Sequence, residues 1–285
     1  MIRDYYELIK PGIIYGNAIT AAAGFFLAAQ GNFNLSLFIA MLLGLSCVIG
    51  SACAFNNLIE IDIDAKMERT KNRALVAGRL DRRDAFWFAL ALGVCGLSIF
   101  AAYVDLLALA VVFLGAVAYL ALYTPMKRMN LWSTAAGSIS GAVPPVVGYV
   151  AVANRLDWAA AILFIILVLW QIPHFYAIGI YRGDEYGAAS LPILPVVKGM
   201  RAAKVHIALY VAAFTLATLS LWYFGYAGAA YAAAAGLASL AWLAFAMLGF
   251  RKGNNDKPWA RKFFLVSLAV LLVISIAISC SGIFA

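Results

Sequence analysis

Charged side chains are scarce in this sequence. Asp, Glu, Lys and Arg make up 12% of its 285 residues, whereas hydrophobic residues make up 65%. Soluble domains carry about 25% charged and roughly 45–50% apolar residues. The shortage of charge excludes an ordinary soluble domain and predicts an integral membrane protein.

Cysteine and histidine are also rare, with four and two residues respectively. The cysteines lack the close spacing of metal-binding segments, which argues against a cysteine-based metal centre. Each falls in a long apolar stretch, so we expect small packing residues that say little about redox compartment. They are Cys47, Cys53, Cys95 and Cys280.

Long stretches without any Asp, Glu, Lys or Arg fill most of the chain. They cover residues 11–59, 85–104, 106–126, 129–154, 158–181, 205–250 and 263–285. A membrane span needs about 20 apolar residues. The two double-length stretches are broken by QGNFN at 30–34 and FGYAG at 224–228, both typical of turns. The sequence predicts an all-α bundle of nine transmembrane helices in one domain, residues 1–285.

Basic residues indicate how this bundle lies in the membrane. Short loops rich in Lys and Arg stay on the cytoplasmic side of most membrane proteins. With the N-terminus inside, nine spans place all 21 Lys and Arg on the inner side except Arg155. We therefore predict a multi-pass protein of the cell inner membrane with cytoplasmic basic loops. The net charge of +8 follows from this topology, and we expect no nucleic-acid partner.

One segment, residues 56–78, joins acidic and basic residues at the end of the second span, and reads NNLIEIDIDAKMERTKNRALVAG. Asn56, Glu60 and Asp64 are spaced at i, i+4 and i+8. On a continuing helix they would share one face within about 12 Å of axis. Carboxylate and carboxamide oxygens on one face could hold Mg²⁺.

Basic residues follow that acidic face. Arg69, Lys71 and Arg73 lie just beyond it, and Lys127 and Arg128 end the fourth span in YTPMKR. Mg²⁺ usually binds through one or two carboxylates plus substrate phosphates, so this combination indicates a diphosphate site. For Lys127 and Arg128, a plain inside anchor is an equally open reading.

A second acidic loop follows the sixth span. Arg182, Asp184 and Glu185 open it, and residues 182–204 also hold Lys198. We expect the two loops to meet at a central cavity that opens to the inside face. A topology signal and headgroup anchor is the alternative for this second loop.

Two features of the spans indicate what lines the cavity. A histidine inside a span is costly, which favours a functional role for His174, whereas we expect His206 to be a packing residue. Residues 140–150 carry two adjacent prolines in mid-membrane, a break that is tolerated where it lines a cavity. Nearby aromatic residues could flank a flat ligand or a cationic intermediate. They are Tyr149, Trp170, Phe175 and Tyr176.

The segment from Asn56 to Gly78 resembles the signature of the UbiA-type intramembrane prenyltransferases, a family of nine-helix membrane proteins. Further segments look like the branch of that family that farnesylates haem, and the resemblance extends over essentially the whole chain. These segments are YTPMKR, SGAVPPVVGY, QIPHFYAIGIYR and LPILPVVKG. Two departures are Glu60, where the family often has aspartate, and a second loop without two aspartates four apart.

The resemblance implies transfer of the farnesyl group of farnesyl diphosphate, bound through Mg²⁺, to a vinyl group of haem b. It implies catalytic roles for Asn56, Glu60, Asp64 and Glu185, and metal ligation by these four and Asp184. The diphosphate ligands would be Arg69, Lys71, Arg73, Lys127, Arg128 and Arg182. His174 would face the haem. Beyond the two substrates and the lipid bilayer, assembly factors of haem–copper oxidases are the expected partners.

Three other functions stay open on the residues alone. Within the same family, the acceptor could be an aromatic quinone precursor. A secondary transporter also has broken helices, although its charges are expected near the bilayer midplane. A membrane cytochrome could use His174 and His206 as axial ligands to a permanent haem.

Overall fold

The computed structural model describes residues 2–283, and within them it contains helices and no strands. Nine helical segments of this range are long and apolar enough to cross a membrane, which confirms the predicted number of spans. The spans are α2 (Pro11–Ala29), α3 (Leu35–Ile59), α5 (Arg82–Tyr103), α6 with η1 and α7 (Leu106–Val117, Ala118–Tyr123, Thr124–Met129), α8 with α9 (Ser133–Gly141, Val143–Ala153), α10 (Trp158–Tyr181), α13 (Gly199–Tyr223), α14 (Ala229–Leu248) and α15 (Asp256–Ile283). A short helix, α1 (Ile2–Leu8), precedes the first span, and three more lie in the connections: α4 (Ile61–Asp64), α11 (Gly183–Ala188) and α12 (Leu194–Val197).

Both predicted turns divide their double-length stretches. Helix α2 ends at Gln30, which takes a left-handed conformation with φ of 43°. Asn34 then caps α3, because its side chain accepts a hydrogen bond from the Leu37 amide at 3.1 Å. A turn at residues 224–228 separates α13 from α14 in the same way.

The fifth span is broken where its adjacent prolines lie. Helix α8 ends at Gly141, and α9 begins at Val143 with Pro144 and Pro145 in its first turn. Proline is tolerated there because the first amides of a helix have no intrahelical partner. The break therefore needs no unusual backbone geometry.

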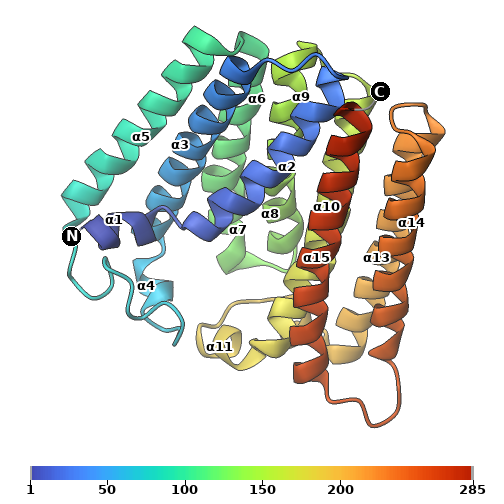
Figure 1. Ribbon diagram of the computed structural model, residues 1–285. Coiled ribbons are helices and arrows are strands. Elements are labelled where there is room, and N and C mark those ends of the chain that lie inside the picture. Colours follow the sequence, from blue (N-terminus) through green and yellow to red (C-terminus); the bar gives the residue numbers. More distant parts are fainter. Residues whose placement is uncertain (1, 284–285) are drawn as a thin grey trace.

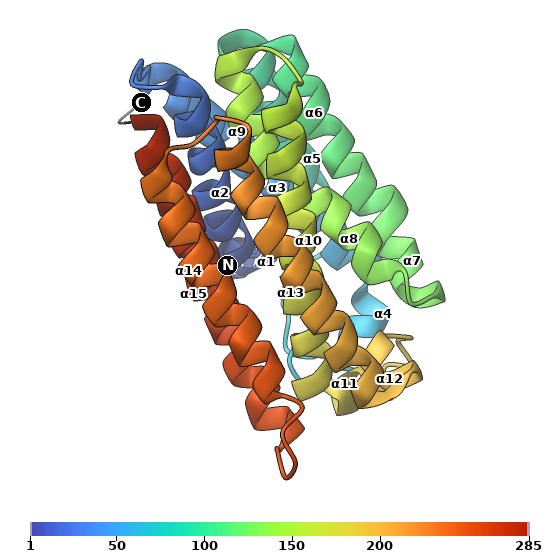
Figure 2. The ribbon, with the colours of Figure 1, turned by 90° about the vertical axis from the view of Figure 1, so that its right-hand side faces the viewer.

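The spans run roughly along one common direction and pack side by side into a single bundle (Figures 1 and 2). Helix α3 packs along α5, α2 crosses α9, and α10 packs against α13 and α15. Small residues allow the α2–α9 crossing, because a Cβ atom at Gly24 or Gly148 would overlap a backbone carbonyl oxygen of the other helix.

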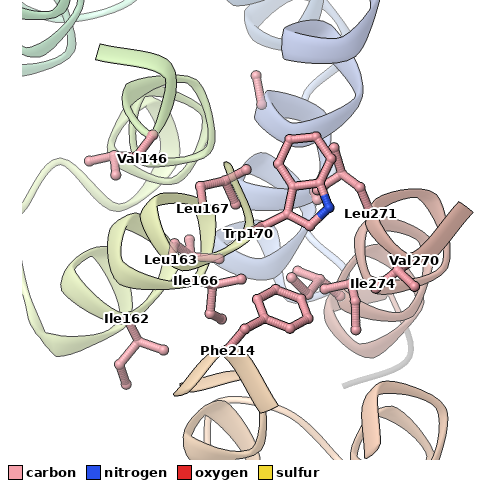
Figure 3. Packing of buried hydrophobic residues seen from close by; sticks show 14 of the residues in the cluster. Val146, Ile162, Leu163, Ile166, Leu167, Trp170, Phe214, Val270, Leu271 and Ile274 are labelled. Atoms are coloured by element: carbon pink, nitrogen blue, oxygen red, sulfur yellow. The ribbon is translucent and has the colours of Figure 1, made fainter. Parts of the chain in front are cut away.

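Helix α10 lies in the apolar core between several neighbours. Figure 3 shows Trp170 of α10 reaching toward Leu271 of α15, with Phe214 of α13 beside them. This packing fixes one wall of the cavity described below.

The short helices mark one end of the bundle. Helices α4 and α11, which follow the second and sixth spans, lie at the lower end in both Figure 1 and Figure 2. The α9–α10 connection, which carries Arg155, lies at the other end. The loops expected to carry the site are thus on the same side of the molecule.

Candidate active site

The acidic face begins where α3 ends. The expected continuous helix is wrong, because α3 stops at Ile59 and Glu60 bends the chain with φ of −99° and ψ of 15°. The sequence IEIDID is rich in weak helix formers. Hydrogen bonds still run from the Glu60 amide to Asn56 (2.9 Å) and from the Asp64 amide to Glu60 (2.8 Å). The three predicted metal ligands therefore still lie one helical turn apart, and all three are buried.

Each of the two carboxylates faces a basic side chain, one from the fourth span and one from the same segment. Lys127 Nζ lies 2.8 Å from Glu60 Oε2. Arg73 Nη1 pairs with Asp64 Oδ2 and donates to Asn57 Oδ1 at 2.9 Å. Two of the predicted diphosphate ligands, Arg73 and Lys127, thus contact the acidic face.

Lys10 is a site residue that the sequence reasoning missed. Its Nζ donates to Asn56 Oδ1 at 2.6 Å, and Asn56 Nδ2 donates in turn to Thr124 Oγ1 at 3.2 Å. Lys10 adopts a left-handed conformation with φ of 53°, unusual for a residue before proline. Burial lowers the pKa of Lys10 to about 8. By sequence it is an ordinary basic residue at a membrane edge, and only the meeting of two helix ends brings it to Asn56.

The other basic residues of the first loops lie apart from this cluster. Lys71 pairs with Glu68 on the surface, at 2.6 Å. Arg128 forks onto both carboxylate oxygens of Asp62, at 2.7 and 2.8 Å, and its hydrogen bonds hold the pKa of Asp62 below its usual value. Arg69 is exposed and has no ion pair within residues 2–283, so its guanidinium is free for a ligand.

The second acidic loop presents one of its two acids toward its own arginine. Glu185 Oε1 accepts from Arg182 Nη1 at 2.8 Å. Asp184 is 86% exposed at its side chain and pairs with Lys257 at 2.6 Å. The structure therefore does not bring Asp184 to the acidic face of the first loop.

The two loops nevertheless touch, as expected. Ile63 and Met67 of the first loop pack with Ala189 and Leu191 of the second, and Tyr186 covers this cluster. Burial raises the pKa of Tyr186, and the positive charges of Arg69 and Lys127 oppose this rise. An apolar contact thus joins the two loops.

Two carboxylate oxygens of this region are buried and have no hydrogen-bond partner in the described chain: Glu60 Oε1 and Glu185 Oε2. Leaving a buried charged acceptor unpaired costs more than about 1–3 kcal/mol, so each of these oxygens is open to a cation or a hydrogen-bond donor. Within residues 2–283, no three Asp, Glu, His or Cys side chains are grouped to hold a metal ion. A metal here would need the Asn56 carboxamide, a phosphate or water as well, which is how Mg²⁺ is commonly bound. The donor set fits that ion.

An apolar cavity of about 370 Å³ lies inside the bundle, and residues that neighbour the acidic cluster along the chain form part of its wall. Cys53 and Tyr123 line it next to the acidic face, and Trp170 and His174 line it deeper in. Its volume lies in the usual range for ligand pockets, about 300–1,000 Å³. The residues of the fifth-span break, including Gly141 and Pro144, also line it, which confirms that break as a cavity wall.

The aromatic lining differs from the expectation. Trp170 and Phe175 line the cavity, but Tyr149 bonds to Asp157 and Tyr176 packs on His206, so neither belongs to the lining. Tyr119 and Tyr123 line it instead, stacked at 5.4 Å. They occupy a π-helical turn, a local feature frequent at functional sites that the sequence does not display.

The two histidines differ as expected. His174 is buried at the cavity wall, whereas His206 packs against Tyr176 and Tyr210 and does not line the cavity. A haem shared between both histidines, as in a bis-histidine cytochrome, therefore has no support in this arrangement.

Comparison with known proteins decides the family. Residues 17–268 match the profile of the UbiA prenyltransferase family. The chain belongs to this family. A UbiA prenyltransferase is an enzyme, so the transporter and cytochrome readings are set aside. The fold agrees, because the chain resembles a solved digeranylgeranylglyceryl phosphate synthase with a TM-score of 0.80 at 17% identity, covering 100% of this chain and 99% of the other.

Other relatives of this UbiA prenyltransferase carry more specific names. A "Protoheme IX farnesyltransferase" from Pectobacterium atrosepticum is 46% identical over 280 residues, covering 98% of this chain and 95% of the relative. A UbiA homolog from Archaeoglobus fulgidus, solved bound to GPP and Mg²⁺, has a TM-score of 0.67 at 17% identity, covering 97% of this chain and 99% of the other.

Proposed function

We propose that the chain transfers the farnesyl group of farnesyl diphosphate to a vinyl group of haem b, with addition of one water, giving haem O and diphosphate. The observation that carries this proposal is the 46% identity, over nearly the full length of both chains, to a protein named protoheme IX farnesyltransferase. The cavity supports it, because an apolar chamber whose wall includes Cys53 and Tyr123, close in sequence to the paired acids and bases, suits an apolar substrate with a diphosphate head.

Asn56, Glu60, Asp64 and Glu185 are the proposed metal ligands and catalytic acids. The unpaired oxygens of Glu60 and Glu185 support this assignment, as does the Mg²⁺ bound to the A. fulgidus homolog. When bound, Mg²⁺ stabilises negative charge on a leaving diphosphate. Asp184 could bind the metal only if its ion pair with Lys257 were broken, so we rank it below Glu185 as a ligand.

The diphosphate would be held by Arg69, Arg73, Lys127 and Arg182, with Lys10 added by the structure. Three of the predicted cations now neutralise buried or half-buried acids, and Arg69 has no acidic partner in the described residues. Fixed positive groups in a site that admits little water stabilise developing charge more than water does. Lys71 and Arg128 are weaker candidates, because surface acids hold them.

The apolar cavity would hold the farnesyl chain and receive the haem. Its lining keeps water away from an allylic cation, and the stacked Tyr119 and Tyr123 offer π faces that favour positive charge. His174 and Trp170, at the deeper wall, would face the haem.

The whole chain, residues 1–285, would form one catalytic domain in the cell inner membrane, with the acidic loops on the cytoplasmic side. The excess of Lys and Arg at the site end of the bundle supports this orientation. Assembly factors of haem–copper oxidases stay a prediction as partners.

One experiment tests the reaction directly. Purified protein is incubated with haem b and labelled farnesyl diphosphate, with Mg²⁺ or with a chelator. The pigments are then separated and their masses are measured by mass spectrometry. With Mg²⁺ we expect a product with the mass of haem b plus a farnesyl group and one water. With the chelator this product should not form. Prenylation of an aromatic quinone precursor, with no haem product, would overturn the acceptor; full activity with chelator would overturn the metal.

A further inference from the structure

His174 is held in place by one residue of another helix. Its Nδ1 lies 2.7 Å from Ser267 Oγ on α15. Ser267 is completely buried, and its backbone carbonyl also accepts a hydrogen bond from Trp170 Nε1 at 2.8 Å. Two ring residues of α10, one turn apart, are thus fastened to the same serine.

The hydrogen bonds of Ser267 decide which nitrogen of His174 carries the proton. Ser267 Oγ lies 2.6 Å from the Phe264 carbonyl oxygen, which can only accept, so the single hydroxyl proton is donated there. Toward His174 the hydroxyl can then only accept. Nδ1 is therefore the protonated nitrogen, and Nε2 carries a lone pair.

Nε2 has no partner of its own within residues 2–283. The imidazole lies at the wall of the apolar cavity, stacked on Trp170 at 4.6 Å and packed against Phe264 at 4.8 Å. A histidine kept only for packing would leave this nitrogen unsatisfied inside a membrane span, at a cost. The arrangement instead leaves a fixed, unprotonated donor nitrogen for a ligand of the cavity.

We propose that His174 binds the iron of the haem substrate through Nε2, and that Ser267 is the positioning residue that sets the tautomer and direction of the ring. This proposal rests on the proposed function, because it takes haem to be the acceptor. A hydrogen bond from the second nitrogen of a ligating histidine orients the ring and raises its basicity. A ligated iron would fix the macrocycle in the cavity while leaving its vinyl groups without bonds to the protein.

The test uses purified protein in nanodiscs, titrated with haem b in the absence of prenyl diphosphate. Absorbance gives the affinity, and resonance Raman spectra of the ferrous complex give the iron–histidine stretch. We expect this band in the unchanged protein, its loss in His174→Gly, and its return when free imidazole is added. In Ser267→Ala we expect a shifted band and about tenfold weaker haem binding, the usual size of such an effect.

Ser239→Ala is the matched control. Ser239 is equally buried and also donates to a carbonyl of its own helix, that of Ala235 at 2.7 Å, but no histidine contacts it. Its spectrum should match that of the unchanged protein. If His174→Gly aggregates, Ser267→Ala decides, because it keeps the ring.

Contrary outcomes separate this proposal from the reaction itself. Unchanged spectra in His174→Gly would overturn the ligation, and an unchanged band and affinity in Ser267→Ala would overturn the positioning role. Both results are compatible with farnesylated haem in a parallel turnover assay. Absence of that product from the unchanged protein would overturn the proposed function instead, and absence of any haem binding would overturn both.

Discussion

At the scale of single residues, the site pairs acids and the Asn56 carboxamide with basic side chains, two of which come from distant parts of the chain. Lys127 is 67 residues from Glu60, and Lys10 is 46 residues from Asn56. Removing one partner of a buried ion pair strands the other charge, at a cost of about 3–5 kcal/mol. Variants of this site must therefore be checked for folding as well as for turnover.

Asp64→Asn should reduce prenyl transfer by at least about a hundredfold, because it removes a negative ligand for the metal–diphosphate group but keeps the size of the side chain. The rate of diphosphate release from purified protein measures this. Asp84→Asn, an exposed residue at the start of α5, is the control and should keep full activity. Full activity of Asp64→Asn would remove the acidic face from the mechanism.

Lys10→Met should lower kcat/KM for the prenyl diphosphate by about tenfold or more, since a hydrogen bond to a charged group is worth about 1.5–3 kcal/mol. Steady-state kinetics at several substrate concentrations provide the measurement. Lys198→Met changes an exposed lysine of the second loop and serves as the comparison. Equal kinetics for the two variants would remove Lys10 from the proposed diphosphate ligands.

At the scale of helices, the breaks and close approaches shape the cavity. The bend at Glu60, the gap between α8 and α9 and the π-helical turn of η1 all adjoin it or its acidic end. The crossing of α2 and α9 forms without side chains at its contact points. Regular helices surround the site, and residues at the irregular segments line it or lie next to it.

Gly148→Ala should destabilise the protein by about 1–3 kcal/mol, because the new methyl group would strike the Ala21 carbonyl oxygen across the crossing. Thermal unfolding in detergent would show a lower midpoint. Gly236→Ala is the matched control: its Cβ would meet only Leu219, at an ordinary 3.6 Å. A stability of Gly148→Ala equal to that of the control would mean that the helices move apart easily.

At the scale of the whole molecule, charge is segregated to one end. The loops that carry the site are basic, and Arg155 lies at the opposite end. This asymmetry supports the proposed orientation with the site in the cytoplasm. In that orientation a water-soluble leaving group would depart into the cytoplasm.

Cysteine labelling tests this orientation. In a protein whose four native cysteines are replaced by alanine, an impermeant maleimide added to intact spheroplasts should modify Arg155→Cys. Lys252→Cys, in the exposed connection between α14 and α15, should react only after the membranes are opened. The reverse pattern would invert the proposed topology.

The sequence was sufficient for the number of spans and the place of the breaks. Apolar length determines a span, and QGNFN or a proline pair ends a helix through local backbone preferences. The sequence also predicted that Asn56, Glu60 and Asp64 lie one helical turn apart, because the pitch of a helix fixes which residues are neighbours. The bend at Glu60 was not predicted, because contacts from Lys127 and the following loop outweigh weak local propensity.

What the chain determined by itself, then, is its class, its passage through the membrane and the residue types of its acidic site. Only the tertiary structure decided the partners of those residues: Lys10 on Asn56, Asp184 drawn away by Lys257, and Ser267 on His174. Such pairs join helices far apart in sequence, and no local pattern encodes them. They depend on which helix ends the packed bundle brings within hydrogen-bond distance.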